Sequence, residues 1–397
     1  MAGKRQRFAD RRKACGYSQE AFAEEIGTNR STIHRWENGS VDPQPCQRPA
    51  ITKALDITQK ELDVLLHGDQ KEPRARLAIS SEPSSNDEFE AWELMRRVAA
   101  SDVGEETLDR LEVAFDGLAM AYPITPPQDL LERVREHTSY VAHLMDARKT
   151  LKEHRRLLVT GGWLSLLGAT LHIDLKQENA ATARLQTAAA LAKQADHQEI
   201  EAWCYETEAW RVLTAGNFAH AAKLSQMAQG IAPVGSSAKI QATAQEGRAQ
   251  ARLGNSDETY SAIKRVQDMA ATLSRPDRPE HHYRYDPAKA VAYTATTLAW
   301  IGDPAAEPYA REVIARLRPS DDIAKWPRRV ASANIDLALV LLKDSRLDEA
   351  CDAASKAILS GRVVPSNHWR ALEVVKAVEA RQLPEASDLR EAYQGMK

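Results

Sequence analysis

The stretch SQEAFAEEIGTNRSTIHRWENG, residues 18–39, places a Gly-Thr-Asn break between two short segments whose apolar residues have helical spacing. Ser18 is a residue type that caps helix N-termini well. Ala21, Phe22 and Ile26 fall on one face of the helix that follows. The first segment is therefore predicted to be a short amphipathic helix that ends at the break.

A second helix is predicted after Gly27, which has the backbone freedom that a sharp turn requires. Thr28 or Asn29 can cap this helix, and Ile33 and Trp36 face inward. The same spacing leaves a polar outer face made of Arg30, Ser31, His34 and Arg35. Such a helix-turn-helix can place its second helix in a DNA major groove. There arginine can donate two hydrogen bonds to guanine, and serine and histidine offer adaptable contacts to other base edges.

Two blocks of this region match a known family in order and in separation. They are RRKACGYSQEAFAEEIG, residues 11–27, and STIHRWENG, residues 31–39. Residues 5–66 therefore resemble the lambda-repressor and Cro-like helix-turn-helix domain of the Xre type. The resemblance implies a five-helix bundle that reads DNA through its third helix.

The resemblance also implies roles for single residues. Gln19, at the start of the second helix, would contact the DNA backbone or a base edge. Bases would face Arg30, Ser31, His34 and Arg35, and phosphates would lie near Asn29, Thr32 and Asn38. The family pairs an arginine of the first helix with the glutamate of WENG, here Arg12 and Glu37. These two are predicted to form a structural ion pair that docks the first helix on the third, with no part in DNA reading.

The sequence departs from the family directly after WENG, where members often carry basic residues that bind phosphate. Here the stretch SVDPQPCQRPAITKAL, residues 40–55, contains Asp42 and three prolines. Arg48 and Lys53 are the remaining cationic candidates, so a modest nonspecific affinity for DNA is expected. The alternative for the whole block is a helix-turn-helix that is retained for protein contacts.

Length and composition indicate a multidomain protein. A single core does not usually extend over 397 residues. The net charge is −3, but the first 53 residues contain ten Lys or Arg against six Asp or Glu, which permits an anionic partner there. The four cysteines form no Cys-x-x-Cys pair, which favours free thiols in a reducing compartment. Residues 1–20 are too charged for a secretory signal, and no run approaches the roughly 18 apolar residues of a membrane span, so a cytoplasmic protein without membrane contact is expected.

The domain organisation follows from a change in composition between Gly68 and Glu88. The stretch GDQKEPRARLAISSEPSSNDE loses hydrophobic periodicity and gains proline, serine and alternating charge. Residues 1–68 are therefore predicted to be the DNA-binding domain and 69–88 a linker. After the linker no sustained alternation of the kind found in strands occurs, so the fold is predicted to be all-α. Residues 89–150 are expected to form a helical capping region before a repeat domain at 151–397.

The repeat is clearest in EAWRVLTAGNFAHAAKLSQMAQGIAP, residues 208–233, where a helix, a Gly-Asn-Phe turn and a second helix precede a proline. This pattern resembles the tetratricopeptide repeat. Small residues that would let paired helices approach recur at Gly168, Ala209, Gly247, Ala295 and Ala338. Their spacings of 41, 38, 48 and 43 residues exceed the consensus of about 34. A solenoid of tetratricopeptide-like α-hairpins is predicted, and generic stacked α-hairpins are the alternative.

Motifs of enzymes and cofactor sites are absent from the sequence. No glycine-rich phosphate loop, His-Glu-x-x-His or Gly-x-Ser-x-Gly occurs, so neither catalysis nor a cofactor is expected. The stretch PDRPEHHYRYDP, residues 276–287, holds His281 and His282 beside Glu280 and Asp286. Adjacent histidines point in different directions on a regular element, so a solvated loop is favoured over a metal site. Tyr283, Arg284 and Tyr285 of this loop could form a lid over a groove.

A candidate ligand site lies on the inner face of the repeats. In tetratricopeptide proteins the first helix of each pair lines the concave face. An alignment on the small residues places there Trp203, Glu206, Trp210, Arg248, Arg252 and Trp300. Aromatic rings beside guanidinium groups suit an extended peptide or a ligand that carries a carboxylate. Against this, tryptophan at helical spacing is usually a core residue, and arginine on a helix is usually solvated.

An Xre-type reader joined to tetratricopeptide-like repeats resembles the peptide-sensing regulators of Gram-positive bacteria. The resemblance implies a one-component transcription regulator that binds double-stranded DNA as a homodimer, on a palindromic operator with half-sites about 34 Å apart. It also implies a repeat domain that senses a peptide or small-molecule effector. The alternative is a repeat-domain scaffold that a protein partner regulates.

Overall fold

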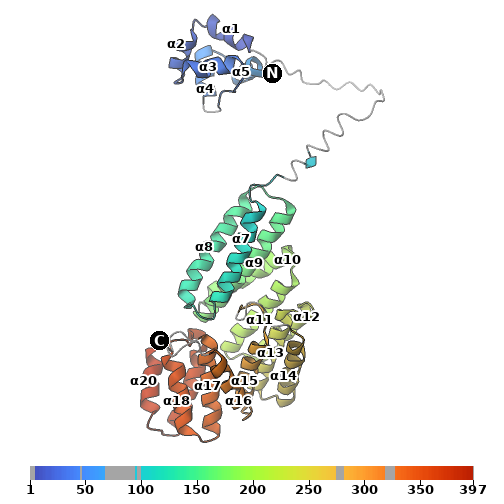
Figure 1. Cartoon of the computed structure of the whole chain (residues 1–397), viewed down its shortest axis with the longest axis vertical. Helices are drawn as coiled ribbons and strands as arrows, with labels where there is room; N and C mark the ends of the chain where they lie inside the picture. The colour runs from blue at the N-terminus through green and yellow to red at the C-terminus, as the bar shows by residue number, and fades with distance from the viewer. Residues whose placement is uncertain are drawn as a thin grey trace, which may run out of the picture. The chain divides into compact units, whose positions relative to one another are not determined.

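A computed structural model of the chain describes residues 5–44, 47–67, 94–95, 100–273, 281–317 and 327–396. The regular elements of these residues are helices, with no strand among them, as predicted (Figure 1). The chain divides into two compact units, Met1–Ser85 and Asn86–Lys397. The predicted linker, 69–88, lies outside the described residues.

The first unit is the five-helix bundle that the sequence predicts. Its helices are α1 (Gln6–Ala14), α2 (Gln19–Glu25), α3 (Arg30–Glu37), α4 (Arg48–Leu55) and α5 (Gln59–His67). Its core contains Phe8, Phe22, Ile33, Trp36, Ile51, Leu55 and Leu62, each at most 1% exposed. The expectation for Ala21 was wrong, because Ala21 is exposed and Ala23 lies against the core instead.

The turn between α2 and α3 has the expected chemistry. Ser18 caps α2, since its hydroxyl accepts from the amide of Ala21 at 3.0 Å. Gly27 has a φ of 68°, a left-handed value that favours glycine. Asn29 caps α3, and its side-chain oxygen accepts from the amide of Thr32 at 2.9 Å. Local chemistry thus fixes where α3 begins and which of its faces is buried.

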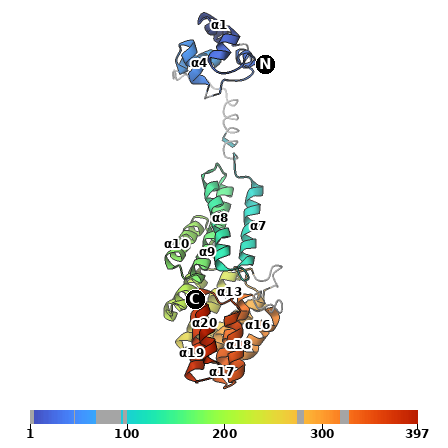
Figure 2. The ribbon, with the colours of Figure 1, turned by 90° about the vertical axis from the view of Figure 1, so that its left-hand side faces the viewer.

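The second unit is built from successive helical hairpins (Figures 1 and 2). Its helices are α7 (Glu105–Ala121), α8 (Pro127–Asp146), α9 (Leu151–Asp174), α10 (Glu178–Gln194), α11 (Gln198–Thr214), α12 (Phe218–Ile231), α13 (Ser237–Leu253), α14 (Ser256–Ala271), α15 (Pro287–Ile301), α16 (Ala306–Leu317), α17 (Arg328–Lys343), α18 (Leu347–Leu359), α19 (His368–Ala380) and α20 (Ala386–Gly395), with a 3-10 turn η2 (Pro365–Asn367) before α19. Each helix from α9 to α18 packs on the next. The array therefore has the solenoid architecture that the repeats predict.

The small residues of the repeat lie where helices meet. Gly168, Ala209, Gly247, Ala295 and Ala338 are buried in α9, α11, α13, α15 and α17, the first helices of successive hairpins. A Cβ atom added to Gly247 would lie 3.1 Å from the Cβ of Ala262 in α14. The backbones of α13 and α14 thus approach too closely for a larger residue there without adjustment.

Helix α9 is the central helix at the beginning of the array, and α7, α8 and α10 pack against it. Among the described residues it is the one helix long and apolar enough to cross a membrane. However, 89% of its apolar 18-residue window is buried inside the unit. Its hydropathy is thus that of a core helix.

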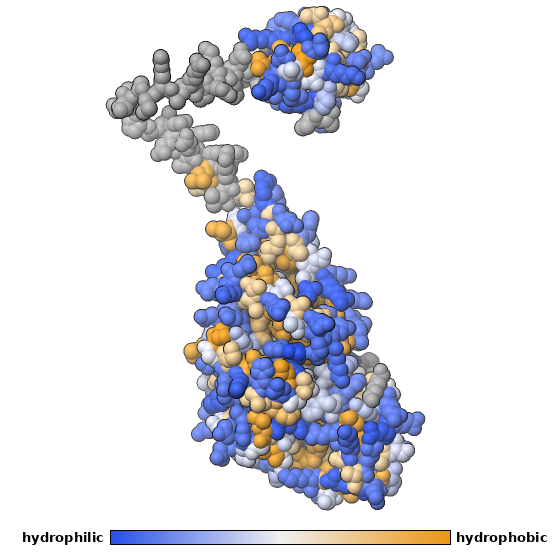
Figure 3. All heavy atoms as spheres, turned by 180° about the vertical axis from the view of Figure 1, so that it is seen from behind, coloured by the Kyte–Doolittle hydropathy of each residue, from blue (hydrophilic) through white to orange (hydrophobic). Residues whose placement is uncertain are grey.

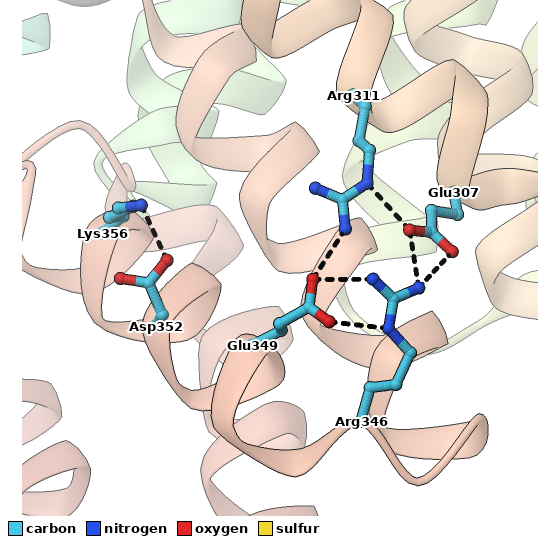
Figure 4. Close-up of polar contacts among 6 residues, drawn as sticks. All are labelled: Glu307, Arg311, Arg346, Glu349, Asp352 and Lys356. Carbon is cyan, nitrogen blue, oxygen red and sulfur yellow. Dashed lines mark hydrogen bonds and ion pairs between the residues drawn. The ribbon is translucent and has the colours of Figure 1, made fainter.

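Charged side chains bridge neighbouring hairpins on the outside of the array. Figure 4 shows Arg346 between Glu307 of α16 and Glu349 of α18, with nitrogen–oxygen distances of 2.6–2.8 Å. Arg311 also donates to both carboxylates, at 2.8 and 3.0 Å. Because the ion pairs of Glu307 and Glu349 are partly solvated, each contributes little stability. On the face that Figure 3 shows, hydrophobic residues lie scattered between hydrophilic ones.

The array closes on itself through contacts between its beginning and its end. Arg328, the first residue of α17, pairs with Asp174 at the end of α9 at 2.6 Å and donates to the carbonyl of Thr125 at 2.6 Å. Ser366 of η2 donates to the same aspartate at 3.3 Å. Arg362 donates to the carbonyl of Ile124 at 2.9 Å. The inner face of the solenoid is thereby bounded by both ends of the unit.

Candidate functional site

Helix α3 presents a polar, cationic face to solvent. Arg30, Ser31, His34 and Arg35 are exposed, while Ile33 and Trp36 on the opposite face are buried. The guanidinium of Arg30 pairs with Glu20 of α2 at 2.8 Å, and its side chain remains 68% exposed. The four residues that the sequence assigns to base contacts therefore share one accessible surface.

Short hydrogen bonds order the side chains around this face. The Asn29 side-chain oxygen accepts from the hydroxyls of Ser31 at 2.7 Å and Thr32 at 2.8 Å. A nitrogen of His34 lies 2.9 Å from the amide nitrogen of Asn38. Arg35 makes a long contact of 3.4 Å with the Thr32 hydroxyl. Among the residues assigned to phosphates, Asn29 and Asn38 cap the two ends of α3, and Thr32 lies within it beside the base-facing residues.

A half-buried carboxylate joins the first three helices. Glu37 accepts from Arg12 of α1 at 2.7 Å and from the amide of Gln19 of α2 at 2.5 Å. The Arg12 side chain is only 4% exposed and also donates to the carbonyl of Tyr17. Gln19, which the sequence assigns to DNA, therefore also has a structural partner. Of the two cationic candidates beyond α3, Arg48 pairs with Asp63 of α5 at 2.9 Å.

The second unit contains a cavity on the inner face of its array. Its lining residues come from α9, α11, α13, α15, α17 and α19, and from the segments 122–123, 282 and 362–367. Four of the six predicted ligand residues line it: Trp203, Glu206, Trp210 and Arg248. Tyr122 and Tyr293 add further aromatic walls. The alignment on small residues thus places most of the candidate site at one cavity.

The cavity wall carries more positive than negative side chains. Its cationic residues are Arg248, Lys289, Arg328, Arg329, Arg362 and Arg370. Its carboxylates are Asp174, Glu206 and Asp336. Arg328 is paired with Asp174 and Arg370 with Asp336, at 2.6 and 2.5 Å. The lining as a whole therefore holds more cationic than anionic side chains.

Arg248 has an unusual environment for an arginine. Its guanidinium lies 4.5 Å from the ring centroid of Tyr293 and donates to the side-chain oxygen of Gln245. No carboxylate of the described residues lies within ion-pair distance of it, and its buried Nε has no hydrogen-bond partner. Burial lowers the pKa of Arg248, but the free guanidine value is so high that the group stays charged at neutral pH.

Glu206 is the counterpart of Arg248 on α11. It is 5% exposed, and the amide of Gln241 donates to it at 3.0 Å. The same amide donates to the Tyr293 hydroxyl at 2.8 Å. Burial raises the pKa of Glu206, although the hydrogen bond from Gln241 and the positive charges of Arg248 and Lys289 act against this rise. Protonation of this carboxyl would further increase the positive balance of the wall.

Two of the predicted ligand residues, Arg252 and Trp300, do not line the cavity. Arg252 stacks on Trp300 and Trp369, 4.3 and 5.0 Å from their ring centroids. It also forms a two-bond ion pair with Glu373 of α19, at 2.6 and 2.8 Å. This cluster joins α13, α15 and α19. Arg252 and Trp300 instead contact Trp369 and Glu373 of α19, so the cavity's role in ligand binding does not extend to them.

The predicted solvated loop around His281 is instead buried over the part that the structure describes. His281 and Tyr283 are 2% and 3% exposed, and Tyr283 packs on the rings of Phe115, Trp163 and Trp203. His282 lines the cavity. The expectation of a solvated segment was therefore wrong, because its aromatic residues fill the space between α7, α9 and α11. Glu280 lies outside the described residues.

Lys289 holds this segment in place. Its ammonium donates to the carbonyls of His281 at 2.6 Å, His282 at 3.0 Å and Arg284 at 2.5 Å. Burial and the positive charge of Arg284 lower the pKa of His281 to about 4, although Asp116 lies 3.3 Å away. Within the described residues no group of three metal-ligating side chains gathers here or elsewhere.

Several cavity residues were missed by the sequence reasoning, among them Asp174, Lys289, Arg328, Asp336 and Arg370. A signal did exist for Asp336, which interrupts the apolar run ANIDLALVLL, residues 333–342. A buried charge inside such a run needs a partner, and Arg370 and the hydroxyl of Thr296 provide it at 2.5 and 2.6 Å.

Comparisons with known proteins bear on the first unit. No curated protein sequence matches the chain. Among solved structures, the crystal structure of Bacillus thuringiensis PlcR in complex with the peptide PapR7 and DNA is similar at a TM-score of 0.32 and 13% identity, over 95% of this chain and 97% of that one. Residues 8–45 match the helix-turn-helix family. The first unit of the chain thus carries an Xre-like helix-turn-helix domain.

Proposed function

We propose that the protein is a sequence-specific DNA-binding transcription regulator whose helical array dimerises and senses a peptide or small-molecule signal. The observation that carries the proposal is the exposed cationic face of α3 in a unit that matches the helix-turn-helix family. A helix with one buried and one cationic face, held by two flanking helices, suits insertion into the major groove.

The proposed DNA contacts divide into two kinds. Arg30 and Arg35 donate to guanine edges, with Ser31 and His34 contacting neighbouring bases. Asn29, Thr32 and Asn38 lie beside phosphates and fix the register of the helix. A single α3 reads only a few base pairs, so a homodimer on a palindromic operator supplies the remaining affinity and specificity.

The proposed sensor is the cavity of the second unit. An effector acts on DNA binding only if it has different affinities for two states of the protein. A cavity lined by helices from both ends of the array supports this role, because a ligand there touches many helices at once. A bound effector would favour one curvature of the array and thereby one spacing of the two DNA-binding units in the dimer.

The DNA-binding part is tested by mobility shift with operators selected from random duplexes by the full chain. The double variant Arg30→Ala, Arg35→Ala removes two base contacts and should weaken specific binding about thirtyfold or more. Arg110→Ala is a matched control, since Arg110 is an exposed arginine of α7 whose ion-pair partner among the described residues is Glu106. Equal affinity of wild type and double variant would disprove the assignment of α3 as the recognition helix.

The salt dependence of the same complex tests the acidic turn after α3. Few phosphate contacts are expected there, because Asp42 pairs with Arg5 and Arg48 pairs with Asp63. The log–log slope of affinity against salt should therefore correspond to only a few phosphates per protomer. A steep slope would mean that other cations contact the DNA backbone.

The sensor proposal has its own test, which is whether a peptide or small molecule changes the DNA affinity of the purified protein. If only a protein partner alters DNA affinity, the scaffold alternative replaces the sensor.

A further inference from the structure

The unpaired charge of Arg248 points to a missing anion. Removing a guanidinium from water costs free energy unless a carboxylate or another anion compensates it. In this cavity, Arg328 and Arg370 have such partners at ion-pair distance. Among the described residues Arg248 contacts Gln245 and the face of Tyr293, and the charge of Glu206 acts on it from beyond ion-pair distance. The Nε of Arg248 and that of Arg370 are buried donors without acceptors. Donors of this kind suit an anionic oxygen that comes from a ligand.

The closure of the array limits the shape of the ligand. A long extended peptide binds along a groove or a sheet edge, and an enclosed cavity offers neither over its full length. Here Arg328 bridges Asp174 and Thr125, and Arg362 donates to Ile124. The beginning of α17 and the segment between α18 and η2 therefore meet the α7–α8 loop beside the cavity. His282, from a segment fixed by Lys289, supplies another part of the wall. These contacts favour a compact ligand.

The walls also select for a flat group. Trp203, Trp210 and Tyr293 line the cavity beside Arg248. Aromatic walls with a few convergent polar groups are the usual construction of a small-molecule site. Planar rings stack on such side chains, while the guanidinium fork donates hydrogen bonds to two oxygens of a phosphate or carboxylate.

We infer that the effector is a compact molecule with an aromatic or other flat group and one phosphate or carboxylate, and that Arg248 binds this anion. The inference rests on the proposed sensor function and specifies its ligand class. Binding neutralises the unpaired charge and so stabilises the closed array. A phosphate and a carboxylate both present a pair of anionic oxygens to Arg248. The test therefore uses one probe of each kind to distinguish them.

The test measures binding of probes to the full chain by calorimetry. Phenyl phosphate and benzoate are the two anionic probes, and benzylamine is a cationic probe of the same size. We expect at least one anion to bind and benzylamine not to bind. Arg248→Gln should weaken anion binding about tenfold or more, and Arg248→Lys should weaken it less. Arg211→Gln is the control, because Arg211 lies on α11, pairs with Glu178 and Glu208, and is not part of the cavity lining.

A second readout separates a ligand-binding arginine from a structural one. Without a ligand, Arg248→Gln removes a buried charge that has no ion-pair partner among the described residues and should leave the melting temperature unchanged or higher, whereas loss of a structural arginine would lower it. The inference is overturned if benzylamine binds as well as the anions, if no anion binds, or if Arg248→Gln leaves binding unchanged. It is also overturned if extended peptides with blocked ends bind tighter than both anions. These outcomes leave DNA binding through α3 untouched, since the mobility shift of Arg30 and Arg35 variants tests that separately.

Discussion

The two units use arginine in opposite ways. In the first unit, Arg30 and Arg35 lie on the outside of α3 and remain hydrated. In the second, Arg248 and Arg370 lie in the cavity of the array, where their donors are buried. An exposed arginine can meet a long polyanion such as DNA at little desolvation cost, whereas a buried one can meet only a carboxylate of its own fold or a ligand that enters the cavity. The surroundings of the residue, more than its type, decide which partner it suits.

The strongest test of this contrast lies within the first unit, between a buried and an exposed arginine. Arg12→Met removes the partner of the half-buried Glu37, and breaking a buried ion pair in this way typically costs about 3–5 kcal/mol. Hydrogen exchange of residues 5–67 in the full chain should show this loss. Arg30→Ala breaks an exposed pair with Glu20 and should cost far less stability, because water screens such a pair. Equal losses for the two variants would mean that burial does not set the energetic role of these arginines.

A second effect is expected from pH and should be confined to the array. Burial lowers the pKa of His172, His197, His281 and His282 below the ordinary value of 6.5. A histidine whose pKa is lowered by folding binds more protons when unfolded, so its contribution to stability is present above about pH 6.5 and is lost as the pH falls towards 4. For His281 alone the loss between about pH 7.5 and about pH 5 is on the order of 2 kcal/mol.

Thermal unfolding of the full chain at about pH 7.5 and about pH 5 checks this expectation. Hydrogen exchange should assign the acid loss to residues of the second unit, since His34 of the first unit is exposed. The variant His281→Gln should flatten the pH dependence without removing it. An array as stable at the lower pH as at the higher one would contradict the buried placement of segment 281–286.

The smallest expected effect concerns the cap of the recognition helix. Asn29→Ala removes the acceptor of the Thr32 amide and of the Ser31 hydroxyl, and loss of such a cap costs about 1 kcal/mol. Denaturation of the full chain, followed by a signal from the first unit, should show this decrease in the free energy of unfolding. Asn29→Asp keeps the acceptor and is the matched control. If Asn29→Ala weakens DNA binding far more than it weakens stability, Asn29 also contacts DNA directly.

Much of the first unit could be predicted because its signals are local. The caps at Ser18 and Asn29, the turn at Gly27 and the inward Ile33 and Trp36 depend on residues within one or two turns of each other. Hydrophobic spacing alone therefore separates the cationic face of α3 from its core face. Ala21 was misplaced because alanine is compatible with either face, and contacts with other helices decide its position.

The cavity could be predicted only in part, because it depends on contacts between distant segments. Spacing from the small residues placed Trp203, Glu206, Trp210 and Arg248 at the inner face. The same spacing placed Arg252 there too, but Arg252 pairs with Glu373, which lies 121 residues further along the chain. No local pattern reports such a partner. Likewise, the proline-rich sequence before His281 suggested a solvated loop, although Tyr283 packs on rings from three other helices.

The sequence by itself determined the helical class, the helix-turn-helix and the repeat of small residues in the first helix of each hairpin, since caps, turns and apolar spacing act over a few residues. The tertiary structure decided that the array closes on itself and that Arg248 remains without a carboxylate while Arg328 and Arg370 find one. The physical reason is that the cost of burying a charge depends on every group around it, and those groups come together only when the distant ends of the chain meet.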